Sequence, residues 1–154
     1  ARADMNSLNF YHLNKTNTYL ALCKLVEKAF EQKQKVLVRT NSQEVTDEID
    51  ETLWSYDAVT FLPHSKLGDQ LTEPGPIHIS SENENSNNAS YLFIVNTANF
   101  SIPEICQFQR TFVLFNNLDK DFKDIARKLW VDSADCDIER KYWVEENKGW
   151  VLKT

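Results

Sequence analysis

Glycine is scarce in this 154-residue sequence, which contains only Gly68, Gly75 and Gly149. None of the three lies in a G-x-G-x-x-G or G-x-x-x-x-G-K pattern, and the turn after the first predicted strand reads Asn-Lys-Thr-Asn over residues 14–17. Side chains in that turn would obstruct a pyrophosphate, which needs close approach to the backbone. The sequence therefore argues against a dinucleotide site or a P-loop, and we expect no cofactor.

Cysteine is also sparse. Cys23, Cys106 and Cys136 are widely spaced and odd in number, and no pair has the spacing of metal ligands. This pattern is typical of reduced thiols in a cytosol, where disulfides are rare. Cys23 falls on the apolar stripe of a predicted helix, so we expect it to be buried in the core. We predict no metal site.

The three histidines, His12, His64 and His78, are scattered along the chain, and we interpret them as structural. No set of nucleophile, base and orienting group can be assembled from the sequence, so we expect a non-catalytic protein. One alternative stays open, which is a small α/β enzyme whose site at the strand ends uses His64 or His78 with Cys106. A deep pocket where these side chains converge would favour that alternative.

Positive charge is in deficit, because the formal net charge is -6 and the pI is about 5.1. An acidic surface repels the phosphates that Lys and Arg would have to neutralise. Direct nucleic-acid binding is therefore a disfavoured alternative, and we expect nucleic acid to be reached only indirectly. No apolar run approaches the ~20 residues of a membrane span, and no basic-then-apolar leader opens the chain. We expect no membrane partner and a cytoplasmic location.

The sequence does contain an alternation of strand and helix patterns. Helices are predicted over residues 17–33, 41–54 and 119–134, the second of them capped by Asn41 with Glu44 at the N3 position. Strands are predicted over residues 8–13, 36–38, 58–62, 77–79, 91–95 and 112–115, with loops over 63–76 and 80–88 and a terminal hairpin over 138–152 turning at Gly149. This alternation predicts one Rossmann-like, three-layer α/β domain over residues 8–154, with a mainly parallel sheet and helices on both faces. Residues 1–7 are expected to be an N-terminal extension.

One edge of the last predicted helix combines cations with an aromatic residue. At 100° per residue this edge holds Lys120, Lys123, Arg127 and Trp130. Ion pairs within the helix would explain part of it, because Lys123 can pair with Asp119 and Lys128 with Asp124. They do not explain the aromatic one turn beyond two cations. That combination suits an acidic segment with an apolar anchor, in which Arg binds a carboxylate through two N–H groups.

The second predicted helix ends near Trp54, where its apolar stripe stops. Two interpretations stay open for this residue. Trp54 covers the core as a lid, which composition favours, or it projects from the surface.

Several short blocks of sequence stand out together. They are Phe-Tyr-His-Leu at 10–13, Lys-Val-Leu-Val at 35–38, Leu-Trp at 53–54 followed by Phe-Leu-Pro-His at 61–64, Gly-Pro-Ile at 75–77, and Phe-Lys-Asp-Ile-Ala-Arg-Lys-Leu-Trp at 122–130. With these blocks the chain resembles the chi subunit of the bacterial DNA polymerase III holoenzyme, over nearly its whole length from Leu8 to about Trp143. The Leu-Trp block followed by Phe-Leu-Pro-His is the most specific.

The resemblance implies a Rossmann-like domain without nucleotide chemistry, which acts in the bacterial cytoplasm as a non-catalytic accessory subunit of the replicative DNA polymerase. It also implies two partners: the acidic C-terminal tail of single-stranded DNA-binding protein, and the clamp loader, reached through its psi subunit or another subunit.

The family's tail site uses a Lys, an Arg four residues later and an aromatic three beyond it. These positions correspond to Lys123, Arg127 and Trp130, with Lys120 on the same edge. The resemblance assigns the psi contact to Trp54, Phe61 and Pro63.

Overall fold

The computed structural model describes residues 6–14, 17–56, 64–66, 75–82, 85, 87–95, 100–116, 120–136, 138–146 and 149–153. The strands are β1 (Ser7–Leu13), β2 (Val36–Arg39), β3 (His64–Lys66), β4 (Ile77–Ser80), β5 (Tyr91–Val95), β6 (Arg110–Asn116), β7 (Glu139–Glu146) and β8 (Gly149–Leu152). The helices are α1 (Thr18–Glu31), α2 (Gln43–Tyr56), α3 (Ile102–Ile105), α4 (Lys120–Asp132) and the 3-10 helix η1 (Ser133–Asp135).

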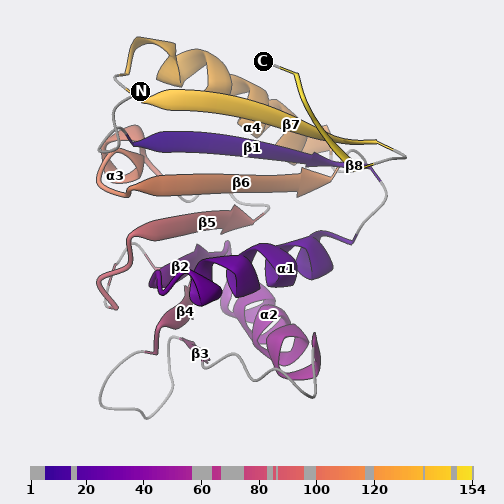
Figure 1. Ribbon diagram of the computed structural model, residues 1–154, viewed down its shortest axis with the longest axis vertical. Coiled ribbons are helices and arrows are strands. Elements are labelled where there is room, and N and C mark those ends of the chain that lie inside the picture. Colours follow the sequence, from indigo (N-terminus) through magenta and orange to yellow (C-terminus); the bar gives the residue numbers. More distant parts are fainter. Residues whose placement is uncertain are drawn as a thin grey trace.

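The described strands form one sheet in the order β3-β4-β2-β5-β6-β1-β7-β8 (Figure 1). Neighbouring strands pair in parallel throughout this sheet, except for the antiparallel hairpin of β7 and β8. Helices α1 and α2 pack with one apolar cluster, and α3 and α4 pack with another on the opposite face. The predicted α/β class, with a mainly parallel sheet between two helical layers, is confirmed.

The central strand β5 is apolar along its whole length, as expected for a strand of a sheet that helices cover on both faces. Every residue of β5 is buried. In β1 the side chains alternate: Phe10 joins the cluster beneath α4, whereas Leu13 joins the cluster beneath α1. The face on which a β1 residue lies therefore decides which helix it contacts.

Helix α1 begins and ends at local signals. The Asn17 side chain accepts hydrogen bonds from the backbone N–H groups of Tyr19 (2.9 Å) and Leu20 (3.3 Å), which is the role of an N-cap. At the other end, Lys33 has a φ of 61°. The N–H of Gln34 bonds to the carbonyl of Ala29 at 3.0 Å, the closure expected when a helix ends in a left-handed residue.

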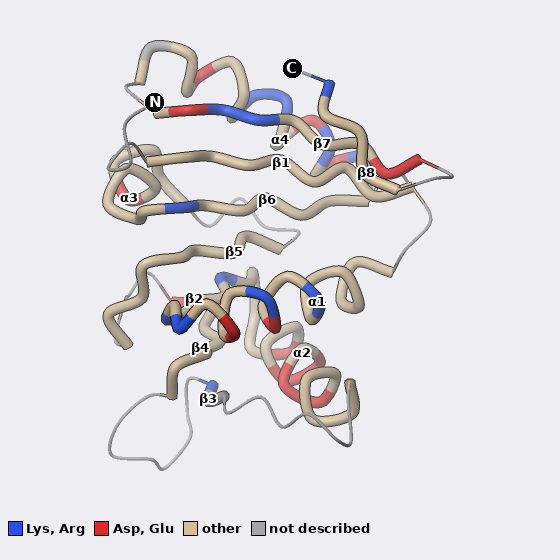
Figure 2. The backbone as a smooth tube through the Cα atoms, in the orientation of Figure 1, with Lys and Arg blue, Asp and Glu red and all other residues tan. Residues whose placement is uncertain are grey.

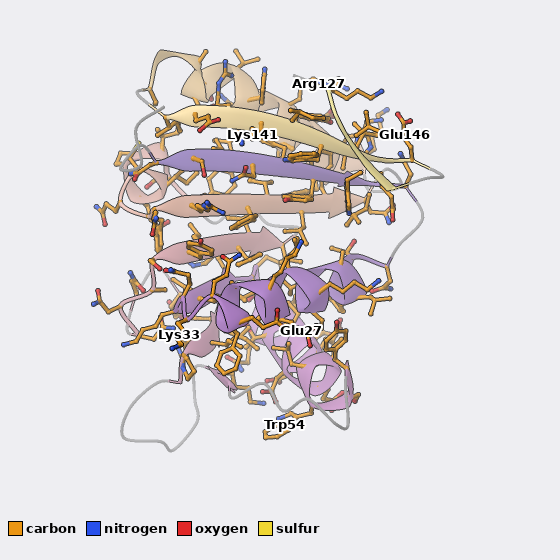
Figure 3. The ribbon with its side chains drawn as sticks, viewed as in Figure 1. Glu27, Lys33, Trp54, Arg127, Lys141 and Glu146 are labelled. Carbon is orange, nitrogen blue, oxygen red and sulfur yellow. The ribbon has the colours of Figure 1, made fainter. Side chains whose placement is uncertain are left out.

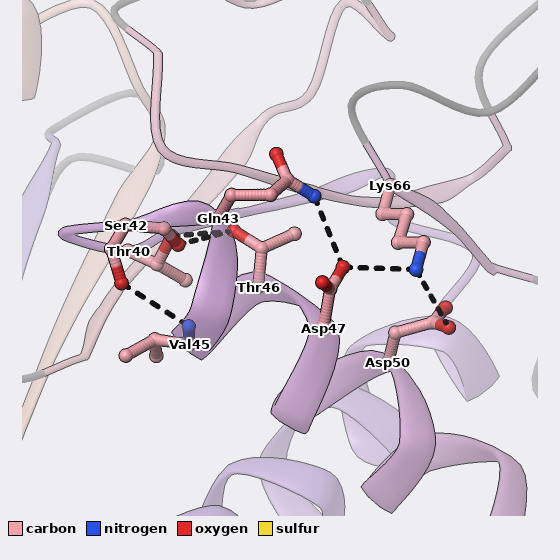
Figure 4. Close-up of polar contacts among 8 residues, drawn as sticks. All are labelled: Thr40, Ser42, Gln43, Val45, Thr46, Asp47, Asp50 and Lys66. Atoms are coloured by element: carbon pink, nitrogen blue, oxygen red, sulfur yellow. Dashed lines mark hydrogen bonds and ion pairs between the residues drawn. The ribbon is translucent and has the colours of Figure 1, made fainter.

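Helix α2 is capped one residue later than the sequence suggested. Ser42 Oγ accepts a hydrogen bond from the backbone N–H of Val45 at 3.2 Å, and Thr46 Oγ1 donates to the Ser42 carbonyl at 3.0 Å (Figure 4). The prediction of Asn41 as N-cap is therefore wrong. Asn and Ser are both favoured caps, so two suitable residues stand side by side here, and Thr46 also bonds to Thr40 at 2.7 Å.

A short edge strand occupies part of the region predicted as a loop. β3 pairs in parallel with β4, and Lys66 Nζ lies 2.9 Å from Asp47 Oδ1 and 3.8 Å from Asp50 Oδ2 on α2 (Figure 4). The hydrogen bond from Lys66 lowers the pKa of Asp47. The prediction of a loop throughout residues 63–76 is thus wrong at β3, because contacts between distant segments formed a strand there. The strand predicted over residues 58–62 lies outside the described residues.

The C-terminal part of the chain follows the prediction closely, with two additions. The sequence did not reveal α3, whose four residues are too few for a periodic pattern. Helix α4 ends at Asp132 and is followed directly by the 3-10 helix η1. Gly149 begins β8 opposite Glu146, and its φ of +121° favours glycine. Lys128 pairs with Asp132 at 2.7 Å and not with Asp124 as expected, and Asp119 lies outside the described residues.

Candidate functional site

A pocket of about 360 Å³ lies where α4, β7 and the residue after β8 meet. It is lined by Lys123, Arg127, Trp130, Tyr142 and Lys153. Three residues of the edge predicted from the sequence therefore share one pocket. The fourth, Lys120, is exposed at the start of α4 and does not line it.

The helical period explains why three of these residues meet. Positions 123, 127 and 130 are separated by four and three residues, so their side chains lie on one edge of α4. The same helix buries Phe122, Ala126 and Leu129 against the sheet. Burial of this stripe sets the rotation of the helix, and the cationic edge beside it is held at the margin of the sheet.

Trp130 forms a rigid wall of the pocket. Its ring meets Phe10 edge-on with 5.4 Å between centroids and Tyr142 edge-on with 5.9 Å. Arg140 Cζ lies 4.2 Å from the centroid of the Trp130 ring, and Arg140 Nη1 donates to the Trp130 carbonyl at 2.5 Å. Edge-on aromatic contacts and cation–π contacts are each worth about 0.5–1.5 kcal/mol. The indole is therefore preorganised before any ligand arrives.

Tyr142 contributes an uncharged surface. Its hydroxyl lies 3.1 Å from His12 Nδ1, and the His12 ring stacks on Phe115 with 4.9 Å between centroids. Burial raises the pKa of Tyr142, while the neighbouring charge of Arg127 acts in the opposite direction. The phenol is therefore neutral at pH 7, and the charge of the pocket lining comes from its three cations. These contacts place His12 in a structural role.

Lys153 reaches the pocket from the β7–β8 hairpin, directly after β8. Its backbone N–H donates to the Tyr142 carbonyl at 2.8 Å, and its Nζ lies 2.9 Å from Glu146 Oε2. Sequence reasoning missed Tyr142 and Lys153. The alternating pattern predicted the hairpin, but only the pairing of β7 beside β1 brings that hairpin to α4.

Charge is unevenly distributed over the molecule. Figure 2 shows Lys and Arg on α4 and at the end of the chain, near one another, and Asp and Glu along α2. The sequence of α2 contains Glu44, Asp47, Glu48, Asp50 and Glu51. A protein of net charge -6 thus has a local cationic pocket away from its acidic helix.

Trp54 lies near the C-terminal end of α2 and is 56% exposed. The interpretation of Trp54 as a lid over the core is therefore wrong. Figure 3 shows Trp54 and Arg127 at opposite ends of the long axis of the molecule. Phe61 and Pro63, which the resemblance groups with Trp54, lie outside the described residues.

The side chains of the alternative enzyme site lie on different elements of the described chain. His78 is only 4% exposed on β4. Cys106 follows α3, and its carbonyl accepts a hydrogen bond from Asn6, the residue before β1. Burial raises the pKa of the Cys106 thiol, and the neighbouring Cys136 adds to that shift, so its nucleophilic thiolate is disfavoured. The side chain of His64 is outside the described set.

The described residues contain no group of His, Cys, Asp and Glu arranged to hold a metal ion. None of the described helices combines the length and the apolar character needed to cross a membrane. Cys23 is buried as expected, and burial raises the pKa of its thiol to about 12.

Comparison with known proteins gives consistent matches. A sequence model of the family described as "DNA polymerase III chi subunit, HolC" matches residues 5–140. A Rickettsia prowazekii protein named "Probable DNA polymerase III subunit chi" is 24% identical over 129 residues, which cover 81% of this chain and 78% of that protein. A Haemophilus influenzae "DNA polymerase III subunit chi" is 38% identical over 58 residues, 38% of this chain and 40% of that protein.

Proposed function

The chain belongs to the DNA polymerase III chi-subunit family, and we propose that it links single-stranded DNA-binding protein to the clamp loader during DNA replication. In this role it is a non-catalytic, cytoplasmic accessory subunit that binds other proteins. The α4 pocket binds the acidic C-terminal tail of single-stranded DNA-binding protein. The surface around Trp54 contacts the psi subunit or another clamp-loader subunit.

The chemistry of the α4 pocket is the observation that carries the tail-binding proposal. Lys123, Arg127 and Lys153 supply cations, and Trp130 and Tyr142 supply aromatic surface within the same pocket. Arg can donate to a carboxylate through two N–H groups. A peptide C-terminus with carboxylates and an apolar side chain can contact both groups of residues: its carboxylates bind the cations, and its apolar side chain packs on the aromatic rings.

The expected affinity follows from the exposure of the cations. Arg127 is exposed and Lys123 is half-buried, and exposed charge pairs contribute about 0–1 kcal/mol each. Binding should therefore be modest and should weaken as salt screens the charges. A modest affinity suits a tether that must release while the replication fork moves.

The position of the two surfaces also favours a linking role. Trp54 and Arg127 lie at opposite ends of the molecule (Figure 3). Two partners bound there would not compete for the same area. The acidic remainder of the protein, with a net charge of -6, fits a subunit that reaches single-stranded DNA through a protein already bound to it.

The tail-binding proposal is tested with a peptide that ends in Asp-Ile-Pro-Phe with a free carboxylate. Arg127→Glu should weaken binding by at least tenfold in a titration followed by calorimetry or fluorescence. Lys128→Glu is the matched control, because Lys128 lies on the same helix, is 77% exposed and does not line the pocket. If both variants bind as tightly as the parent chain, the α4 pocket is not the tail site.

A further inference from the structure

We infer that the C-terminal hairpin is the second wall of the α4 pocket, and that Lys153 is a carboxylate-binding residue of that wall. The inference rests on the proposed function, because it names an additional residue for the same acidic ligand. It concerns a part of the chain that the family match does not include. The match ends at residue 140, before Tyr142 and Lys153.

Backbone geometry brings Lys153 to the pocket in a defined register. β8 pairs antiparallel with β7, with Leu152 opposite Trp143. The next N–H, that of Lys153, donates to the Tyr142 carbonyl at 2.8 Å. Residues directly opposite each other on neighbouring strands project to the same face. Lys153 therefore lies on the side of Tyr142, the side covered by α4, and both residues line the pocket.

The ammonium group of Lys153 forms an ion pair with the carboxylate of Glu146 on the same hairpin. Lys153 Nζ lies 2.9 Å from Glu146 Oε2, and the two side chains are 49% and 46% exposed. A pair so exposed is weak, and a carboxylate of a ligand can take the place of Glu146. Glu146 therefore competes with the ligand for Lys153, and removal of its charge should strengthen ligand binding.

Lys153 should strengthen peptide binding and Glu146 should weaken it, so the inference can be tested with the intact chain. With the peptide ending in Asp-Ile-Pro-Phe, Lys153→Ala should weaken binding about two- to fivefold, the range of one exposed charge pair. Glu146→Gln should tighten it by a similar factor of about two to five, because Lys153 loses its internal partner. A peptide with Asn in place of Asp and an amidated C-terminus should abolish both effects.

Lys141→Ala is the matched control. Lys141 lies on β7, the strand that contains Tyr142 and Glu146, and is 40% exposed, but it pairs with Glu139 and does not line the pocket (Figure 3). It removes the same unit of charge, so it reports any general effect of net charge. The inference is supported if Lys153→Ala weakens binding and Lys141→Ala does not.

Three results would overturn the inference. If Arg127→Glu loses binding while Lys153→Ala binds as the parent does, the hairpin is no part of the site although the proposed function stands. If Lys153→Ala and Lys141→Ala weaken binding equally, net charge alone is responsible. If the parent chain does not bind the peptide, the tail-binding proposal and this inference fail together.

Discussion

Arg39 and Glu104 form a bidentate ion pair between the last residue of β2 and the short helix α3. Arg39 Nη1 lies 3.0 Å from Glu104 Oε1 and Arg39 Nη2 lies 2.7 Å from Glu104 Oε2. The Arg39 side chain is fully buried and that of Glu104 is 14% exposed. The pair ties α3 to a central strand on the face of the sheet that α4 also covers.

Loss of one partner of this pair should destabilise the fold. Glu104→Ala removes the carboxylate from a buried guanidinium, which typically costs roughly 3–5 kcal/mol. The measurement is the free energy of unfolding from denaturant titration. The double variant Arg39→Met with Glu104→Leu is the control, and it should recover much of the loss because no buried charge remains. A change below about 0.5 kcal/mol for Glu104→Ala, the size of an ordinary surface effect, would contradict the structural role.

Trp54→Ala should weaken the clamp-loader contact without harming the fold. An exposed Trp at the centre of an interface commonly contributes about 2 kcal/mol or more, equivalent to roughly thirtyfold in affinity. Far-UV circular dichroism and the free energy of unfolding should stay within about 0.5 kcal/mol of the parent, because Trp54 is 56% exposed.

The readout for Trp54→Ala is capture of purified psi and the other clamp-loader subunits. Trp150→Ala is the matched control, since Trp150 is also exposed, at 38%, and lies on β8. Equal capture by both variants and the parent chain would show that the surface around Trp54 is not the contact. Broad loss of folded structure on Trp54→Ala would contradict its exposed position.

Lys33→Gly should stabilise the protein by about 0.5–1 kcal/mol, because glycine adopts a positive φ without the steric cost that a side chain incurs. Lys33 has a φ of 61° just after α1 and is exposed (Figure 3). The control is Lys35→Gly, which removes the same charge from an exposed residue outside the positive-φ set. Thermal unfolding of the two variants should shift in opposite directions. Equal shifts would mean that backbone strain at Lys33 is negligible.

Local patterns in the sequence carried much of the prediction. The continuous apolar runs at 91–95 and 112–115 became buried strands, because a strand covered on both faces needs no polar alternation. Lys123, Arg127 and Trp130 share one pocket because spacings of four and three residues are set by helix geometry alone.

Other features were not settled by the local pattern, and β3 and Trp54 depend on contacts between distant residues. The cap of α2 is Ser42, which lies next to Asn41, and the pattern did not distinguish these two favoured cap residues. β3 formed where the composition indicated a loop, beside β4 and held by Lys66 to α2. Trp54 could have been a lid or an exposed residue, and only the packing of α2 decided that it is exposed.

The sequence by itself determined the α/β class, the absence of a glycine loop for nucleotides and the cationic edge of α4, since each depends on neighbouring residues. Tertiary structure alone decided that this edge is one wall of a pocket. The opposite wall, Tyr142 and Lys153, comes from a hairpin that the pairing of β7 with β1 carries to α4. Strand order is set by burial summed over the whole sheet, and no local stretch of sequence specifies it.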